Sequence, residues 1–215
     1  MGYRGGNGVT AIRAAAITVP LVVGILAGAA VPAGAQPAKG LTCRGAGVDP
    51  GAQVRYRTEA VIDAPLEVIW KLQTDVDRWP SWQQPVTSAE RLDHGPFRAG
   101  SAFHWTTPVP PGTGIPATGL DITSTVRQVK QGVCIRWTGP AVGEGVHIDG
   151  VHVWNFTETK GGVKVSTEET HTGPQVDADV PVATAILKAG LDGWLADLRA
   201  AAGAQASGWT PAPRS

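Results

Sequence analysis

The sequence predicts an α+β domain, in which an antiparallel sheet of seven strands is followed by a long C-terminal helix. Residues 53–63 alternate between apolar and charged side chains with a period of two, which is typical of a strand with one wet face. Strand-like stretches then follow, mostly separated by Gly or Pro, at 86–93, 101–107, 120–130, 132–139, 146–158 and 163–172. The apolar residues of 182–200 instead recur at the spacing of one helix face.

The helices have recognisable start signals. Asp63 and Pro65 are typical of a helix start, and they precede a short helical pattern that runs as far as Asp75. A second, kinked stretch follows, with two indoles around Pro80 in the segment Trp79-Pro80-Ser81-Trp82. Asp179 and Pro181 mark the start of the C-terminal helix. Its apolar face is formed by Leu187, Leu191, Trp194, Leu195 and Leu198.

The N-terminus has the pattern of an export signal. Arg4 and Arg13 are the only charges before Lys39, an apolar stretch covers 14–30, and small residues at Ala33 and Ala35 fit a signal peptidase site. We therefore expect residues 1–35 to be a signal peptide cleaved before Gln36, which leaves 180 residues with a formal charge of −2. The alternative is a retained membrane anchor, but the stretch is weakly apolar for a span. The expected location is secreted or cell envelope, with membrane contact only through the signal peptide.

The rest of the chain divides into three parts. Residues 36–52 contain four glycines and two prolines without apolar periodicity, which predicts a linker. Residues 53–203 are expected to form one folded domain, and 204–215 a flexible tail.

Composition excludes some partners. The 18 Lys and Arg residues balance the 18 Asp and Glu residues, so no positive field favours nucleic acid. His147, Asp149 and His152 hint at a metal, but in a strand the first two face away from the third. We therefore expect no metal and no cofactor.

Five fragments in order carry a family resemblance: IDAPLEVIWKLQTDVDRWPSW, GSAFHWTT, VCIRWTG, VHVWNF and GGVKVSTEETHTG. Together they resemble the polyketide cyclase/dehydrase branch of the START-like (SRPBCC) superfamily. The resemblance spans about residues 54–200. It implies a helix-grip fold, in which a curved sheet is wrapped on the C-terminal helix with an apolar cavity between them.

Strand parity predicts the residues on the inner face of the sheet. A hairpin loop at Lys160-Gly161 sets His152 opposite Glu169, whereas a loop at Gly161-Gly162 sets it opposite His171. Both put the three side chains on one side, and the same parity places Val133 there. The predicted cavity residues are Phe103, Trp105, Ile122, Ser124, Val126, Ile135, Trp137, His152, Trp154, Thr167, Glu169 and His171.

Aromatic walls with a few polar groups are typical of a ligand pocket. We therefore expect a protein that binds a hydrophobic small molecule, lipidic or aromatic. The alternative is a cyclase-like enzyme with His152 and Glu169 as acid and base, although carrier-bound polyketide assembly is cytoplasmic and export argues against it. A third interpretation is that the two side chains only satisfy each other in a packed core. Ligand, turnover and oligomeric state are left open.

Two further expectations concern the surroundings of the pocket. Cys43 and Cys134 are predicted to form a disulfide, because the cysteines are even in number, the chain is exported and Cys134 points to the outer sheet face; two free thiols are the alternative. The loops 108–119, 139–145 and 173–181 are expected at one end of the sheet, with the first as a gate.

Overall fold

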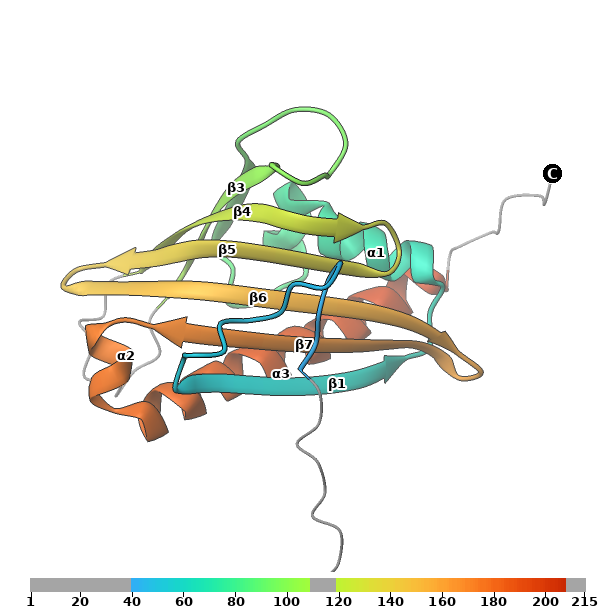
Figure 1. Ribbon diagram of the computed structural model, residues 1–215. Coiled ribbons are helices and arrows are strands. Elements are labelled where there is room, and N and C mark those ends of the chain that lie inside the picture. The colour runs from blue at the N-terminus through green and yellow to red at the C-terminus, as the bar shows by residue number, and fades with distance from the viewer. Residues whose placement is uncertain (1–39, 109–118, 208–215) are drawn as a thin grey trace, which may run out of the picture. The chain divides into compact units, whose positions relative to one another are not determined.

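The fold is a curved seven-stranded antiparallel sheet with helices on one side (Figure 1). The computed structural model describes residues 40–108 and 119–207. The strands follow the order β1-β7-β6-β5-β4-β3-β2 across the sheet. They are β1 (Val54–Ile62), β2 (Ser88–Arg91), β3 (Ala102–Thr107), β4 (Leu120–Lys130), β5 (Cys134–Gly143), β6 (Val146–Thr159) and β7 (Gly162–Thr172).

The predicted fold class and strand number are confirmed, with local differences in β5. This strand begins at Cys134, so Val133 lies in the preceding turn, where its backbone N–H donates to the Lys130 carbonyl. Its side chain is 41% exposed, so its predicted place on the inner face is wrong. The strand also continues to Gly143, which shortens the expected loop 139–145 to Glu144 and Gly145.

The described residues form four helices beside the sheet: α1 (Leu66–Thr74), the 3₁₀ helix η1 (Val76–Ser81), α2 (Pro174–Ala178) and α3 (Val180–Ala206). The Asp179 side chain caps α3 by accepting from the Val182 N–H at 3.1 Å. The sequence did not predict α2, because five residues are too few to show a helical period. The helix α3 runs past the predicted boundary at 204, since Ala202 is buried and Ala206 packs against the core.

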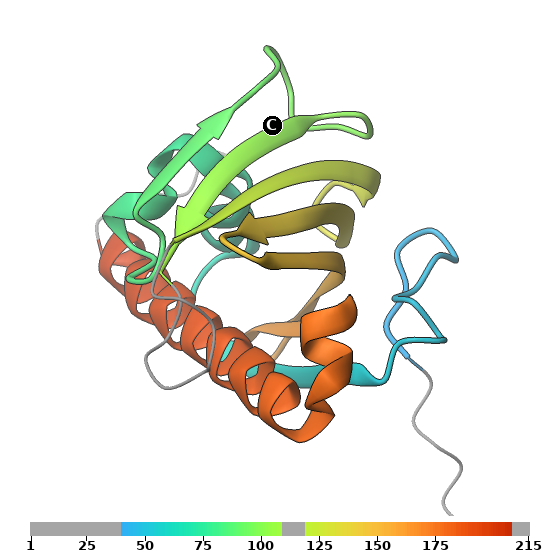
Figure 2. The same ribbon diagram turned by 90° about the vertical axis from the view of Figure 1, so that its left-hand side faces the viewer.

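The curved sheet surrounds α3 on its inner side (Figure 2). The helix buries one face, formed by Leu187, Leu191, Leu195 and Leu198, and each buried leucine contributes about 1.5–3 kcal/mol. The buried apolar residues form two clusters on this side. One gathers around α1, η1 and the C-terminal half of α3, and the other around Val54, Ile148 and the N-terminal half of α3.

The segment from 40 to 52 lies on the opposite side of the sheet from α3 (Figure 2). Cys43 is joined to Cys134 by a disulfide, with 5.4 Å between the two Cα atoms, and both residues are buried. Arg136 Nε donates to the Gly47 carbonyl at 2.7 Å, and the Asp49 N–H donates to Thr170 Oγ1 at 3.2 Å. This part of the predicted linker 36–52 is therefore a packed arm.

The hairpin between β6 and β7 has the first of the two alternative registers. Thr159 pairs with Gly162 around Lys160 and Gly161, and His152 lies opposite Glu169. Gly162 has a φ of +112°, and a Cβ there would overlap the Ile62 carbonyl of β1. Glycine is therefore required where this turn approaches the neighbouring strand.

The predicted signal peptide and most of the loop expected to act as a gate lie outside the described residues. In the ranges 40–108 and 119–207, no helix is long and apolar enough to span a membrane.

Candidate functional site

The structure places all twelve predicted cavity residues on the inner side of the sheet. Most are buried, including Phe103, Trp154 and Thr167 at the centre. Trp105, Glu169 and His171 are half-buried. Alternation along each strand was sufficient to place them on one side, because successive side chains point to opposite faces.

Two indoles from outside the sheet close the aromatic end of this face. The Trp79 ring of η1 lies 5.3 Å from Phe103 and 5.0 Å from Trp194 of α3, measured between ring centroids. The Trp194 ring also lies 5.8 Å from that of Trp105. The sequence predicted the walls of a cavity at this end of the inner face, whereas in this structure the aromatic rings contact one another and fill it.

Sequence reasoning did not place these two rings in the site. Trp79 was recognised only beside the kink at Pro80, and Trp194 only on the apolar face of its helix. The signal that was available is their size, since an indole on an amphipathic element has to be buried against a partner. The sequence does not say which partner.

A polar cluster lies beside the aromatic rings, with one carboxylate between two imidazoles. His152 Nδ1 is 3.3 Å from Glu169 Oε2, and His171 Nε2 is 3.3 Å from Glu169 Oε1. His152 Nε2 is 2.6 Å from Thr167 Oγ1. We call His152, Thr167, Glu169 and His171 the polar cluster.

The environment determines the protonation of this cluster. Burial lowers the pKa of His152 to about 4, although the carboxylate of Glu169 opposes the shift. Burial would raise the pKa of Glu169, but His152, His171 and the hydrogen bond from His171 hold it below its ordinary value. At neutral pH His152 is therefore neutral and Glu169 is ionised. With the His152 proton on Nδ1 facing Glu169, Nε2 accepts from the Thr167 hydroxyl.

Gly150 of β6 lies beside this carboxylate, and its tightest approach is to the backbone of β5. Its partners in the sheet are His171 on β7 and Gly139 on β5. A Cβ at Gly150 would lie 3.2 Å from the Gly139 carbonyl oxygen and 3.5 Å from Glu169 Oε1. The spacing of glycines along the chain does not single out Gly150.

The polar cluster separates the two hydrophobic clusters of the core. Along β6, His152 lies between Ile148 of one cluster and Trp154 of the other. Its ring contacts the indole of Trp137 at 5.1 Å and that of Trp154 at 4.8 Å. The side chains of Glu169 and His171 are 18% and 23% exposed, against 6% for His152. Solvent thus reaches the cluster from the His171 side.

Two hollows in the described residues lie elsewhere. One of about 110 Å³ is lined by Lys71, Leu72, Asp75, Arg78, Ser81, Trp82 and Gln205. The other, of about 200 Å³, is lined by Thr58, Glu59, Ala60, Asp192, Leu195, Ala196 and Arg199. Neither is lined by the polar cluster.

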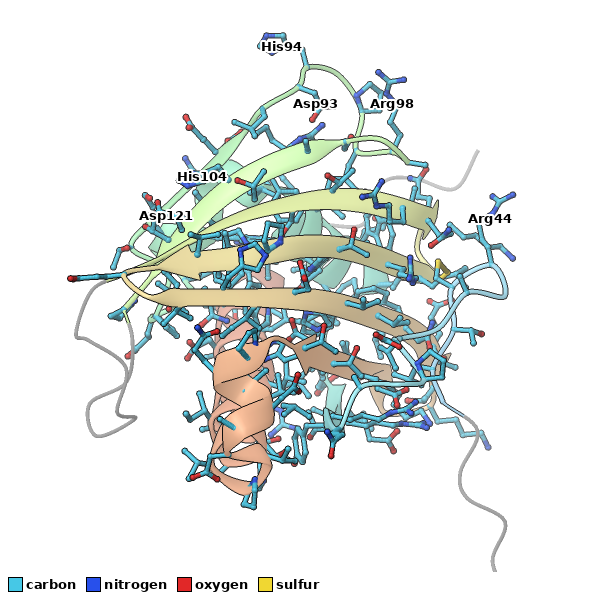
Figure 3. The ribbon with its side chains drawn as sticks, turned by 60° about the vertical axis from the view of Figure 1, so that its left-hand side comes forward. Arg44, Asp93, His94, Arg98, His104 and Asp121 are labelled. Atoms are coloured by element: carbon cyan, nitrogen blue, oxygen red, sulfur yellow. A yellow bond between two sulfur atoms is a disulfide. The ribbon has the colours of Figure 1, made fainter. Side chains whose placement is uncertain are left out.

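Charged groups outside this face pair locally. His104 Nε2 of β3 lies 3.2 Å from Asp121 Oδ1 of β4, and Figure 3 shows both side chains on neighbouring strands. Asp93, in the loop before β3, pairs with Arg91 at 2.9 Å and accepts from the Ser101 hydroxyl at 3.0 Å. Across the part of the chain that the structure describes, no group of three or more His, Cys, Asp or Glu side chains is placed to hold a metal ion.

Comparison with known proteins identifies the family. The family model described as polyketide cyclase/dehydrase and lipid transport matches residues 53–203. The chain therefore belongs to this family, a branch of the START-like (SRPBCC) superfamily. Comparison with curated proteins gives no match.

Solved structures share the fold at low sequence identity. The di-domain ARO/CYC StfQ from the steffimycin biosynthetic pathway aligns with a TM-score of 0.57 and 18% identity, over 72% of this chain and 52% of that one. A START superfamily protein from Mycobacterium smegmatis aligns with a TM-score of 0.56 and 11% identity, over 70% of this chain and 98% of that one. A protein from Thermus thermophilus aligns with a TM-score of 0.57 and 17% identity, over 70% of this chain and 98% of that one. These similarities show the fold alone.

Proposed function

We propose that this member of the polyketide cyclase/dehydrase and lipid transport family is an exported protein that binds a hydrophobic small molecule, lipidic or aromatic, between the sheet and α3. The observation that carries the proposal is the polar cluster beside Trp137 and Trp154. An ionised carboxylate is costly to bury, and a domain that needed only a packed core gains nothing from one between its two apolar clusters. Such groups do serve to orient a ligand in an apolar site.

The protonation of the cluster favours binding over acid/base catalysis. A general acid or base works best with a pKa near the working pH. The pKa of His152 is about 4 and that of Glu169 is also lowered, so both are weak proton acceptors at neutral pH. Ionised Glu169, positioned by neutral His152, is instead suited to accept a hydrogen bond from a hydroxyl group of the ligand. If the protein is instead an enzyme, it should convert the bound molecule into a product of different structure. The mass spectrometry described below would detect that product.

The route of entry follows from exposure. Glu169 and His171 are the members of the cluster that solvent reaches, so the ligand enters from their side. The packed rings of Trp79 and Trp194 close the opposite end. A large ligand therefore displaces at least one of these rings as it goes deeper.

Export is part of the proposal. It is supported by the pattern of residues 1–35 and by the disulfide between Cys43 and Cys134, since disulfides persist in oxidising compartments. We propose that the protein acts outside the cytoplasm or in the cell envelope, without a nucleic acid partner.

Tryptophan emission tests the proposal, because Trp137 and Trp154 adjoin the cluster. 1-Hexadecanol and anthracene, added to the mature protein, should change the emission saturably. Native mass spectrometry of protein from its own host should show a retained apolar molecule, of unchanged mass after incubation. His152→Ala should weaken binding of 1-hexadecanol about tenfold, because Glu169, which accepts a hydrogen bond from the alcohol, loses the imidazole that positions it.

His104→Ala is the matched control, since His104 is a paired surface histidine away from the cluster. It should bind both compounds as the wild type does. Unchanged emission with both compounds and no retained molecule would contradict the proposal. Conversion of the retained molecule into a product would favour the enzyme instead.

A further inference from the structure

Buried polar atoms without a hydrogen-bond partner gather in one part of the core. Among the described residues these atoms are Gln73 Nε2, Trp79 Nε1, Trp82 Nε1, Gln83 Nε2, Gln83 Oε1 and Trp154 Nε1. Both polar atoms of the Gln83 side chain are unpaired, and this residue is fully buried. The great majority of buried polar groups are paired, so each of these requires an explanation.

Four of the five side chains contact Trp194 of α3, and the fifth, Gln83, follows next to Trp82 in the chain. Trp194 Nε1 donates to Gln73 Oε1 at 3.1 Å, which leaves the Nε2 of that amide unpaired. The Trp194 ring lies 5.0 Å from that of Trp79, 6.2 Å from that of Trp82 and 6.0 Å from that of Trp154. Gln83 follows Trp82, and its backbone N–H donates to the Trp79 carbonyl at 2.8 Å. We call these five residues the Trp194 shell.

The unpaired atoms of the shell are mostly donors. Indole Nε1 and amide Nε2 atoms carry hydrogens, so five of the six atoms are donors and only Gln83 Oε1 is an acceptor. A ligand that pairs with them has to present acceptor oxygens. None of the five side chains is charged, so neutral carbonyl oxygens suit the shell better than an ionised carboxylate.

A hollow lies next to the shell. The space of about 110 Å³ between α1, η1 and the end of α3 is lined in part by Trp82, with Leu72 and Gln205. Trp82 therefore belongs both to the wall of this hollow and to the shell. Its displacement would join the two.

We propose that the Trp194 shell is a subsite for the part of the ligand that carries neutral carbonyl oxygens, and that Gln83 is its principal specificity residue. This inference rests on the proposed function, because it assigns a preference to the ligand that the same domain binds. The polar cluster holds another part of the ligand, on the far side of Trp154.

A matched pair of probes tests the subsite. Anthracene and 9,10-anthraquinone have the same three fused rings, but only the second has two carbonyl oxygens. The wild-type protein should bind anthraquinone about tenfold more tightly, as two net hydrogen bonds in a buried site predict. Dissociation constants come from quenching of tryptophan emission.

Gln83→Met tests the residue, and Gln84→Met is its control, because Gln84 is exposed. Gln83→Met should reduce the preference for anthraquinone to about threefold, as the loss of one of the two hydrogen bonds predicts. It should leave anthracene binding unchanged and raise the melting temperature of the ligand-free protein. Gln84→Met should keep the tenfold preference. If Gln83→Met does not fold, Trp82→Phe removes another unpaired donor and should reduce the preference.

Three outcomes would overturn the inference. One is equal binding of the two probes by the wild type, and another is an unchanged preference in Gln83→Met. The third is a crystal structure with anthraquinone bound in which ordered waters, not the probe, pair with the shell. In each of these cases the proposed function still holds as long as anthracene binds. If neither probe binds, the result contradicts the proposed function itself.

Discussion

At the scale of single residues, the polar cluster combines an ionised carboxylate with a neutral imidazole. Strand parity predicted that His152, Glu169 and His171 share a side of the sheet, and the register puts the first two opposite each other. Their protonation was beyond sequence reasoning, because it depends on burial by Trp137 and Trp154 and on the distances between charged groups. The close approach of the Gly139 carbonyl to Gly150 could not be predicted from the sequence either.

The lowered pKa of His152 predicts a specific dependence of stability on pH. The ordinary pKa of 6.5 applies in the unfolded chain and about 4 in the folded one. As the pH falls from 6.5 towards 4, the unfolded chain therefore takes up a proton that the folded protein does not. This group lowers the free energy of unfolding across that window by about 3 kcal/mol in total. Urea unfolding at pH 7, 6, 5 and 4 measures the effect.

His152→Gln provides the comparison for this prediction, because glutamine does not titrate while the other histidines remain. The variant should lose less stability than the wild type between pH 6.5 and 4. Glu169 acts separately, since its lowered pKa removes stability only as the pH falls through that lower value. Parallel stability curves for the two proteins would show that His152 is not buried in its neutral form.

At the scale of elements, the arm from 40 to 52 covers part of the outer face of the sheet and buries side chains there. Arg55 and the Leu41 N–H both pair with the carboxylate of Glu168, which is buried under the arm. Arg44 lies on the same arm (Figure 3). The sequence predicted the disulfide partner of Cys43, but it predicted a linker for the segment. The fixed structure of the segment comes from contacts with distant strands, which local sequence patterns do not show. The arm is thus an element of the domain by contact, without regular secondary structure.

The disulfide of this arm should contribute strongly to stability. It closes a loop with a sequence separation of 91 residues. On the chain-entropy model a loop of that length stabilises the folded state by about 4–5 kcal/mol, so reductant should lower the melting temperature by roughly 10 °C. Calorimetry of the mature protein with and without reductant measures this shift.

The variant with both Cys43→Ser and Cys134→Ser should melt at the temperature of the reduced protein and respond little to reductant. An unchanged melting temperature of the wild type in reductant, or the titration of two free thiols, would show that the disulfide is absent in solution.

At the scale of the whole molecule, the sheet order and α3 give a core that is divided by polar groups. The apolar cluster around α1, η1 and the C-terminal half of α3 lies on one side of the polar cluster, and the cluster around Val54 and Leu187 lies on the other. The family shares this fold among proteins with different activities, so the function rests on these residues and not on the architecture. The proposed export would place the whole domain where its disulfide persists.

The export proposal predicts the N-terminus of the mature protein. Protein isolated from the culture medium or the cell envelope of its host should begin at or near Gln36, because a signal peptidase accepts Ala33 and Ala35. Edman degradation or intact mass spectrometry measures this. A chain that still begins at Met1 in the cytosol would refute export.

The sequence by itself determined the fold class, the strand positions and the side of the sheet on which most inner residues lie. The reason is that periods of two and of 3.6 are local properties of a strand and a helix. Only the tertiary structure decided that Trp79 and Trp194 close the inner face, and that Gln73 pairs with Trp194, 121 residues away. It also decided between the two hairpin registers, in favour of the one in which Thr159 pairs with Gly162 and His152 with Glu169. Contacts between distant segments depend on how the chain closes on itself, and local alternation does not encode that.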